Sequence, residues 1–114
     1  MKIFLPKEYN NKPVPYLFNQ ASVGIFRMIS YQDTAKAIND EHSKELTAVY
    51  ELYKKMAKKV SSDEPLPKVW ITRATNTKYV DIVLAVANDM NIVHNDWLSA
   101  HNDVQDILRA AKNS

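Results

Sequence analysis

LTAVYELYKKMAKKV, at residues 46–60, carries the strongest periodic pattern in this 114-residue chain. Its apolar residues recur at alternating steps of three and four, which places them on one face of an α-helix. They are Leu46, Val49, Tyr53, Met56 and Val60, and Ile38 extends the stripe upstream. The spacing predicts one long amphipathic helix from about Thr34 to Val60, with Asp33 as its N-cap.

The charges along this helix are separated. Acidic residues crowd its first half, and four lysines crowd its end, where the helix dipole favours cations. The lysines are Lys54, Lys55, Lys58 and Lys59. At about 1.5 Å per residue the helix would be roughly 40 Å long, hardly less than the width of a domain this small. If the stripe extends beyond its own domain, a second surface must cover it, and its spacing resembles that of a coiled coil, so we expect a homodimer.

Before the long helix, Lys2 to Leu5 is typical of a short strand, and the Asn- and Pro-rich segment up to Pro15 is typical of a loop. Val23 to Tyr31 is dense in β-branched and aromatic residues, which predicts a buried strand. A helix is the alternative, because Phe18, Ser22, Ile25 and Ile29 also fall at helical spacing. Gly24 counts against the helix by about 1 kcal/mol.

After the long helix, Ser61 to Pro67 is polar and contains two prolines, which predicts a loop. Lys68 to Thr72 is predicted to form a strand. The length of Tyr79 to Met90 favours a helix, although the segment also alternates acceptably as a strand. A last helix follows, with Asn95 as its cap, and we expect its Trp97 to be a core anchor that packs on Val83, Val86 and Met90.

Together these elements predict a single α+β domain over residues 1–114. It would have a short sheet, one long central helix and a C-terminal helical hairpin, with an all-α bundle as the alternative.

Composition excludes several classes of protein. The chain has no cysteine, which excludes disulfides, thiolate metal sites and thiol nucleophiles. Gly24 is its one glycine, so no glycine-rich loop can hold a nucleotide phosphate, and we expect no cofactor. No apolar run reaches the roughly 18 residues of a membrane span, and Lys2 to Pro6 is too short for the apolar region of a signal peptide. We therefore expect a cytoplasmic protein that does not contact the membrane.

Metal-binding and catalytic patterns are weak. His42 lies with Glu41 and Glu45 on one helix, but no second Glu-x-x-His motif supplies matching ligands. His94 and His101 would lie about 10 Å apart, too far for one ion. The chain has no Gly-x-Ser-x-Gly motif and no pair of carboxylates in an apolar setting, so we predict neither a metal site nor an enzyme.

One alternative function comes from residues 87–111, which have the spacing of a helix-turn-helix with Asn91 in the turn. Its second helix carries Asp96, Asp103 and Asp106, which would repel a DNA backbone. A DNA-binding regulator is therefore the second hypothesis.

The leading hypothesis is a non-enzymatic protein-interaction module, a small regulatory or inhibitory binding protein. Its predicted partner-binding residues all lie on the long helix and combine one aromatic residue with the lysine cluster. They are Tyr53, Lys54, Lys55, Lys58 and Lys59. Lys68 and Arg73 follow closely in the sequence and would extend the basic patch.

Overall fold

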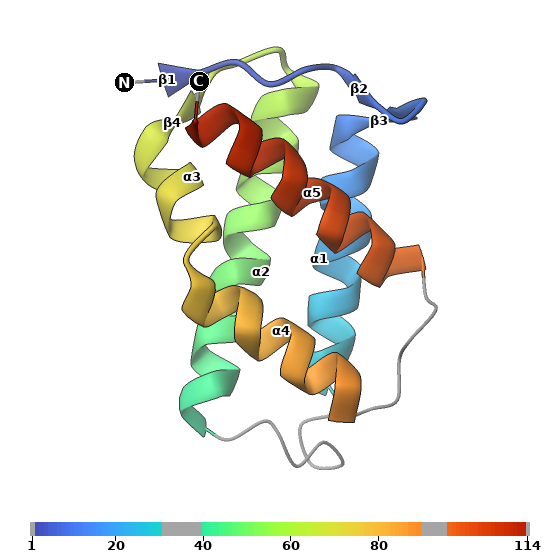
Figure 1. The fold of residues 1–114 in the computed structure, drawn as a ribbon, viewed down its shortest axis with the longest axis vertical. Helices are drawn as coiled ribbons and strands as arrows, with labels where there is room; N and C mark the ends of the chain where they lie inside the picture. The colour runs from blue at the N-terminus through green and yellow to red at the C-terminus, as the bar shows by residue number, and fades with distance from the viewer. Residues whose placement is uncertain (1, 31–39, 90–95, 114) are drawn as a thin grey trace.

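A computed structural model describes residues 2–30, 40–89 and 96–113, and Figure 1 shows how they are arranged. Within these ranges the helices are α1 (Val14–Ser30), α2 (Asp40–Ser61), α3 (Lys68–Ala74), α4 (Thr77–Asp89) and α5 (Asp96–Lys112). The strands are β1 (Lys2–Ile3), β2 (Glu8–Tyr9), β3 (Lys12–Pro13) and β4 (Leu66–Pro67).

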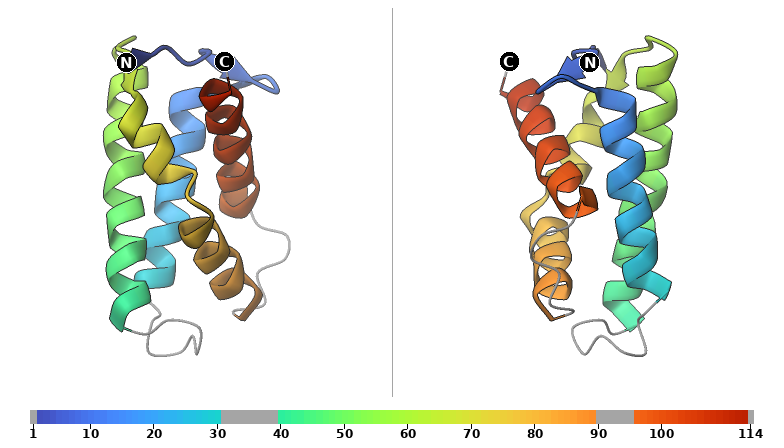
Figure 2. Two further views of the ribbon diagram at one scale, coloured as in Figure 1. Left: turned by 60° about the vertical axis from the view of Figure 1, so that its left-hand side comes forward. Right: turned by 90° about the vertical axis from the view of Figure 1, so that its right-hand side faces the viewer.

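The helices form two layers. Helices α1 and α2 run side by side in one layer, and α3, α4 and α5 cover one face of this pair, as both views in Figure 2 show. Helix α5 packs mainly on α1 and α3, whereas α4 packs on α2 and α1. The described part of the chain measures 38 × 27 × 22 Å along its principal axes.

Two short antiparallel strand pairs lie at one end of the helices, beside the C-terminal end of α5 (Figure 1). In the first, Ile3 of β1 lies opposite Leu66 of β4. The second is a hairpin in which Tyr9 lies opposite Lys12. Asn10 and Asn11 form its turn with φ angles of 51° and 64°, a conformation that asparagine tolerates better than most residues.

Helix α1 begins at Val14, inside the segment predicted to be a loop. The backbone amide of Val14 donates a hydrogen bond of 2.9 Å to the carbonyl oxygen of Lys7. Pro15 occupies the first turn, where the missing N–H of proline breaks no helical hydrogen bond. The prolines of this segment therefore mark the start of a helix as well as the end of a loop.

The prediction of a strand over Val23 to Tyr31 is wrong, because the described part of this segment belongs to α1. Ile25 and Met28 are fully buried, whereas Val23 and Phe26 are about half exposed, which is the periodicity of a helix and not of a strand. Gly24 counted against a helix when only its propensity was considered. In the fold the Trp97 ring of α5 occupies the space that a Cβ atom at Gly24 would need.

The strand predicted over Lys68 to Thr72 is also wrong, because these residues form α3. Pro67 directly precedes the helix with extended φ and ψ angles, and β4 ends there. Val69 and Trp70 have high β-propensity, but tertiary packing of Ile71 and Ala74 in the core outweighs that preference.

The long helix is confirmed in its described part, which runs from Asp40 to Ser61. The predicted cap Asp33 and the start of the stripe at Ile38 lie outside the described residues. At the other end Asp63 adopts a left-handed φ of 59°, and the amide of Glu64 donates to the carbonyl oxygen of Lys59 at 2.8 Å. This bond closes the helix as a Schellman motif does.

The apolar stripe of α2 lies inside the domain. Leu46, Val49, Tyr53 and Met56 are between 0% and 2% exposed, and Val60 packs against the same core. The reason for expecting a second copy over this stripe is therefore removed, because helices of the same chain cover it.

The helix predicted over Tyr79 to Met90 is confirmed as α4 up to Asp89, and Met90 lies outside the described residues. Trp97 is 3% exposed, so it is a core anchor as predicted, and Val83 and Val86 are fully buried. The close contact of Trp97, however, is with Gly24 on α1. Helix α5 packs on α1 of the other layer, a contact that the sequence spacing of residues in α4 and α5 could not predict.

The fold is a small α+β domain, as the sequence predicted. The two-residue strands form its β part, α2 is its long helix, and α4 and α5 are the C-terminal helices. The five helices provide nearly all of the buried apolar residues.

Gly24→Ala tests the contact between α1 and α5. Alanine is the better helix former by about 1 kcal/mol, yet its methyl group would overlap the Trp97 ring. We expect overpacking to dominate and to lower the free energy of unfolding by about 1 to 3 kcal/mol, measured by urea denaturation.

Arg27→Ala is the matched control, because Arg27 lies on the exposed face of the same helix. It should change the free energy of unfolding by less than about 0.5 kcal/mol. If Gly24→Ala is as stable as this control, the contact with Trp97 does not restrict position 24.

Candidate functional site

The five predicted partner-binding residues lie on α2 but face three different environments. Tyr53 is in the core with no exposed surface. Lys54, Lys55 and Lys58 line a hollow between α1 and α2. Lys59 faces α3.

The assignment of Tyr53 to a partner surface is wrong for this fold. Its ring and the Phe18 ring form a T-shaped, edge-to-face pair, with the centroids 5.9 Å apart, between α1 and α2. A stripe at three-four spacing marks the buried face of any amphipathic helix, whether its own domain or a partner covers it. Spacing alone could not distinguish the two.

The surface hollow between α1 and α2 has a volume of about 390 Å³. Its walls are the three lysines and Asn19, Ala57 and Ser61. A second hollow of about 240 Å³ shares Asn19 and Lys54 with the first and is lined further by Ser22, Val23, Phe26 and Tyr50. We call the two hollows together the α1–α2 groove.

Aromatic rings and a cation lie side by side at one end of the groove. The rings of Phe26 and Tyr50 are 5.5 Å apart in a tilted arrangement, and the Lys54 Nζ lies 5.3 Å from the centre of the Tyr50 ring. Phe26 is 52% exposed and Val23 is 45% exposed. Such a surface offers apolar contact area together with positive charge.

The charge of the groove is almost entirely positive. Helix α1 contains no acidic residue, and Glu51 is the single acidic residue of α2 between Tyr50 and Ser61. Among the described residues, none forms an ion pair with Lys54, Lys55 or Lys58. Their charges are thus available to a molecule that enters the groove.

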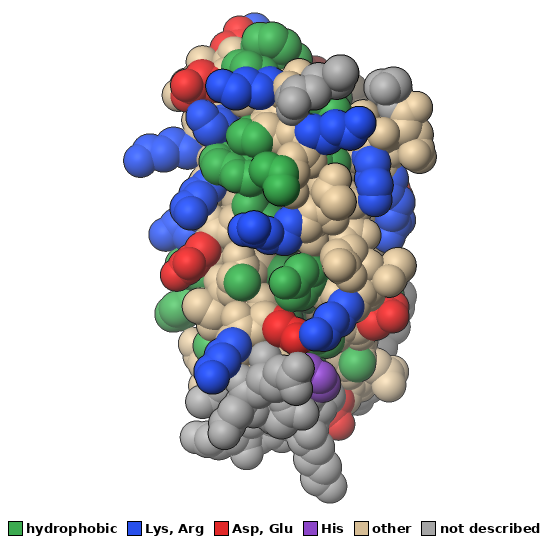
Figure 3. All heavy atoms as spheres, turned by 90° about the vertical axis from the view of Figure 1, so that its left-hand side faces the viewer, with side chains coloured by type: hydrophobic (Ala, Val, Ile, Leu, Met, Phe, Trp, Pro, Cys, Tyr) green, Lys and Arg blue, Asp and Glu red, His purple; other side chains and the backbone are tan. Residues whose placement is uncertain are grey.

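A second basic surface lies on α2 and α3. Lys59 lies 5.7 Å above the Trp70 ring and 3.9 Å from a Glu64 oxygen, and Lys68 and Arg73 are exposed on α3. Figure 3 shows Lys and Arg side chains around a hydrophobic cluster on this side of the molecule. Lys68 and Arg73 thus belong to α3, the helix that Lys59 faces, and they do not line the groove.

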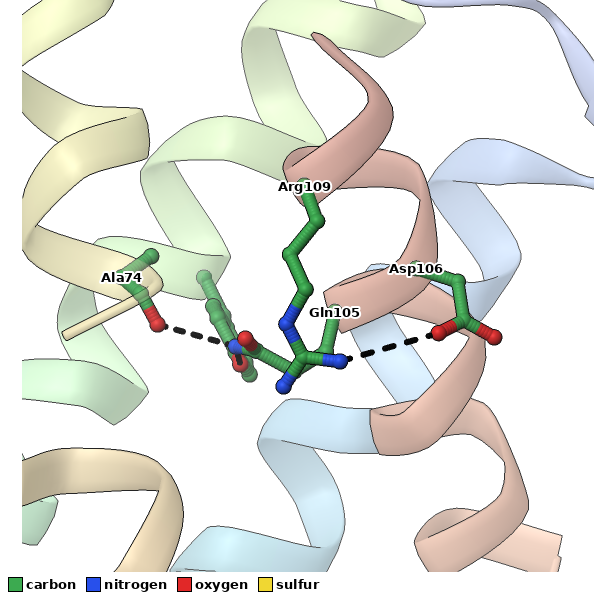
Figure 4. A network of polar contacts seen from close by, with 5 residues as sticks. Ala74, Gln105, Asp106 and Arg109 are labelled. Atoms are coloured by element: carbon green, nitrogen blue, oxygen red, sulfur yellow. Dashed lines mark hydrogen bonds and ion pairs between the residues drawn. The ribbon is translucent and has the colours of Figure 1, made fainter. Parts of the chain in front are cut away.

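A buried polar network connects α2, α3 and α5 (Figure 4). Gln105 donates hydrogen bonds from its side-chain amide to the Tyr53 hydroxyl at 2.8 Å and to the carbonyl oxygen of Ala74 at 2.9 Å. Tyr53 Oη also lies 3.3 Å from His101 Nδ1. The Tyr53 hydroxyl can both donate and accept, so which group donates in this contact depends on the tautomer of the imidazole.

Burial suppresses ionisation in this network. Burial first and the nearby charge of Arg109 second lower the pKa of His101 from 6.5 to about 4. Burial raises the pKa of Tyr53 above its ordinary value, although the hydrogen bond from Gln105 and the charge of Arg109 oppose this rise. Both side chains are neutral near pH 7, which suits a core and gives no general base with access to a substrate.

The pattern around His42 includes Glu41, whose side chain lies outside the described part of the structure. Glu45 pairs with Lys78 of α4 at 2.7 Å. His94 lies outside the described residues, and His101 is 1% exposed in the core. No group of potential ligands in residues 2–30, 40–89 or 96–113 could hold a metal ion.

The helix-turn-helix hypothesis falls partly on residues 90–95, which lie outside the described ranges. In the described part, α5 uses Trp97, Val104 and Leu108 to pack in the core, and Asp96 and Asp106 are exposed. An acidic outer face does not favour approach to a phosphate backbone.

Comparisons of the chain with known protein families, with curated proteins and with solved structures find no match. Among the described helices, none is both long and apolar enough to cross a bilayer.

The sequence did not identify the contribution of α1 to the groove. Asn19, Val23 and Phe26 follow the three-four spacing of one helix face. The predicted strand over residues 23–31 does not place these three side chains on one face. Nothing in the sequence indicated that Gln105 would bond to Tyr53.

The network predicts a pH dependence of stability. An unfolded His101 binds a proton near pH 6.5, whereas the folded one binds it only near pH 4, so the unfolded state holds more protons between these values. The free energy of unfolding should therefore fall as the pH is lowered from about 6.5 to 4, by up to about 3 kcal/mol from this residue.

Urea denaturation of the parent and of His101→Gln at several pH values measures this effect. Carboxylates titrate in both proteins, so the difference between the two curves isolates His101. The free energy of unfolding should decrease less steeply with falling pH in His101→Gln than in the parent. Parallel pH dependences in the two proteins would contradict a neutral buried histidine.

Proposed function

We propose that this protein is a non-enzymatic protein-interaction module, a small regulatory or inhibitory binding protein, and that the α1–α2 groove is its contact surface. The observation that supports this proposal is the combination of half-exposed Phe26 and Val23 with three lysines that have no described ion-pair partner. Aromatic residues are enriched at the centres of protein interfaces, where a polar rim surrounds them.

The non-enzymatic character remains a prediction from the sequence. It rests on the lack of cysteine and of a glycine-rich loop, and on the burial of His101. A cytoplasmic location is also a proposal, which the cysteine-free composition supports.

A homodimer remains a prediction as well, although the buried stripe of α2 no longer motivates it. Light scattering at tens of micromolar measures the mass directly. A mass near the 13.1 kDa of one chain would exclude the homodimer and would not affect the proposal of a protein-interaction module.

DNA binding is the second hypothesis, and salt-dependent retention separates it from the first. A protein that holds phosphates binds heparin and mixed duplex strongly at about 50 mM salt. Flow-through under this condition would remove the DNA-binding hypothesis.

The main prediction concerns capture of a protein partner from host lysate. Reversing Lys54, Lys55 and Lys58 to glutamate should reduce the captured partner by about tenfold or more, because three favourable contacts become repulsive. Quantitative mass spectrometry of the captured proteins provides the measurement.

The control reverses Lys2, Lys12 and Lys68, which are exposed and lie outside the groove. It changes the net charge by the same amount and should retain the partner. Circular dichroism must show that both variants are folded. Equal capture by the parent and both variants would contradict the groove as contact surface.

A further inference from the structure

Three apolar side chains on the outer side of α1 are only about half covered by the described domain. Tyr16, Val23 and Phe26 are 48%, 45% and 52% exposed, and Asn19 completes a spacing of three, four and three along the helix. The opposite face, which includes Leu17, Ile25 and Met28, is fully buried. These three side chains therefore give the outer side of α1 an apolar contact surface of its own.

The groove beside this face has the length of a short helix. On α2 it extends from Tyr50 to Ser61, which at about 1.5 Å per residue is roughly 16 Å, or three helical turns. The two hollows join at Asn19 and Lys54, so they form one concave seam between α1 and α2. A seam between two packed helices is a typical seat for a third helix, which inserts residues at i, i+3 or i+4, and i+7.

The charges on the seam determine the kind of helix. Lys54, Lys55 and Lys58 form the α2 side, and the only charged residue of α1 is Arg27. An occupant with acidic residues along one flank would pair with these cations at the rim while its apolar face covers Phe26 and Val23. A second copy of this chain would bring lysines against lysines across a two-fold axis, which like-charge repulsion disfavours.

We propose that the α1–α2 groove binds an acidic amphipathic helix of a partner protein. This inference rests on the proposed function and names the chemistry of the partner. Val23 and Phe26 of α1 supply the apolar contact area, and Lys54, Lys55 and Lys58 set which side of the incoming helix faces α2.

The shape of the surface favours a helix over two other anionic partners. A flat bilayer could contact the outer side of α1 but could not fill a hollow lined by Asn19, Ala57 and Ser61. A nucleic acid would pair with the lysines but would leave the aliphatic surface of Val23 without a match, because nucleic-acid sites stack bases on aromatic rings.

The test uses a synthetic peptide of about 15 residues, with leucines at i, i+3, i+4 and i+7 and glutamates along one flank. Titration into the isotopically labelled full chain, followed by backbone amide NMR, should shift the signals of Val23, Phe26 and Tyr50. The dissociation constant should be on the order of micromolar.

Matched peptides and protein variants show how much the charged and the apolar contacts each contribute to binding. Replacing the glutamates by glutamine, or making Lys54→Glu with Lys58→Glu, should weaken binding about tenfold or more. Phe26→Ser should weaken it similarly, whereas Leu84→Ser, at an exposed position on α4, should not change it. Both serine variants remove an exposed apolar side chain, so they should remain folded.

Three outcomes would overturn the inference. They are a scrambled peptide that binds as well as the designed one, shifts that map outside the groove, and tighter binding of a 15-nucleotide single strand or of phosphatidylserine vesicles at the same residues. If the peptide fails while the groove lysines are still needed to capture a partner from lysate, the proposed function stands and only the helical, acidic character of the partner is wrong.

Discussion

Trp97 of α5 packs against α1 at Gly24, where the two layers of the fold meet. A Cβ atom at position 24 would overlap the Trp97 ring, so the ring or one of the two helices would have to shift. Because Gly24 faces α5, helical geometry turns the neighbouring Val23 and Phe26 outward, next to Tyr50 of α2. The contact with α5 and the apolar wall of the surface groove therefore lie on different sides of the same helix.

The position of α5 also brings His101 and Gln105 over Tyr53. These three polar side chains are almost completely buried, and hydrogen bonds link Gln105 to Tyr53 and Tyr53 to His101. Buried polar groups add little net stability compared with apolar side chains of similar size, but they have strict geometric requirements. Here they favour one register of α5 against α2, because a shift by one residue would separate donor from acceptor.

Elements whose residues show one dominant physical effect could be predicted from the sequence. The stripe from Leu46 to Val60 and the lysines at its end predicted α2, since burial periodicity and the helix dipole agreed there. The predictions for Val23 to Tyr31 and Lys68 to Thr72 were wrong, because local propensity favours a strand there and long-range packing requires a helix. Tyr53 shows the remaining limit. Its position on the stripe was correct, but only the fold reveals that α1 and α5 cover it.

Gly24 and Trp97 are far apart in the sequence, and their contact has a consequence for the order of folding. Contacts between distant residues close long loops of chain, and the entropy of closing them opposes early formation. Helices α1 and α2 are nearer in sequence and share a larger interface than α1 and α5. We expect the α1–α2 pair to form first and α5 to dock on it later, so that the groove is in place before the opposite side of α1 is covered. A refolding experiment in which Trp97 becomes buried before α1 and α2 are protected from hydrogen exchange would contradict this order.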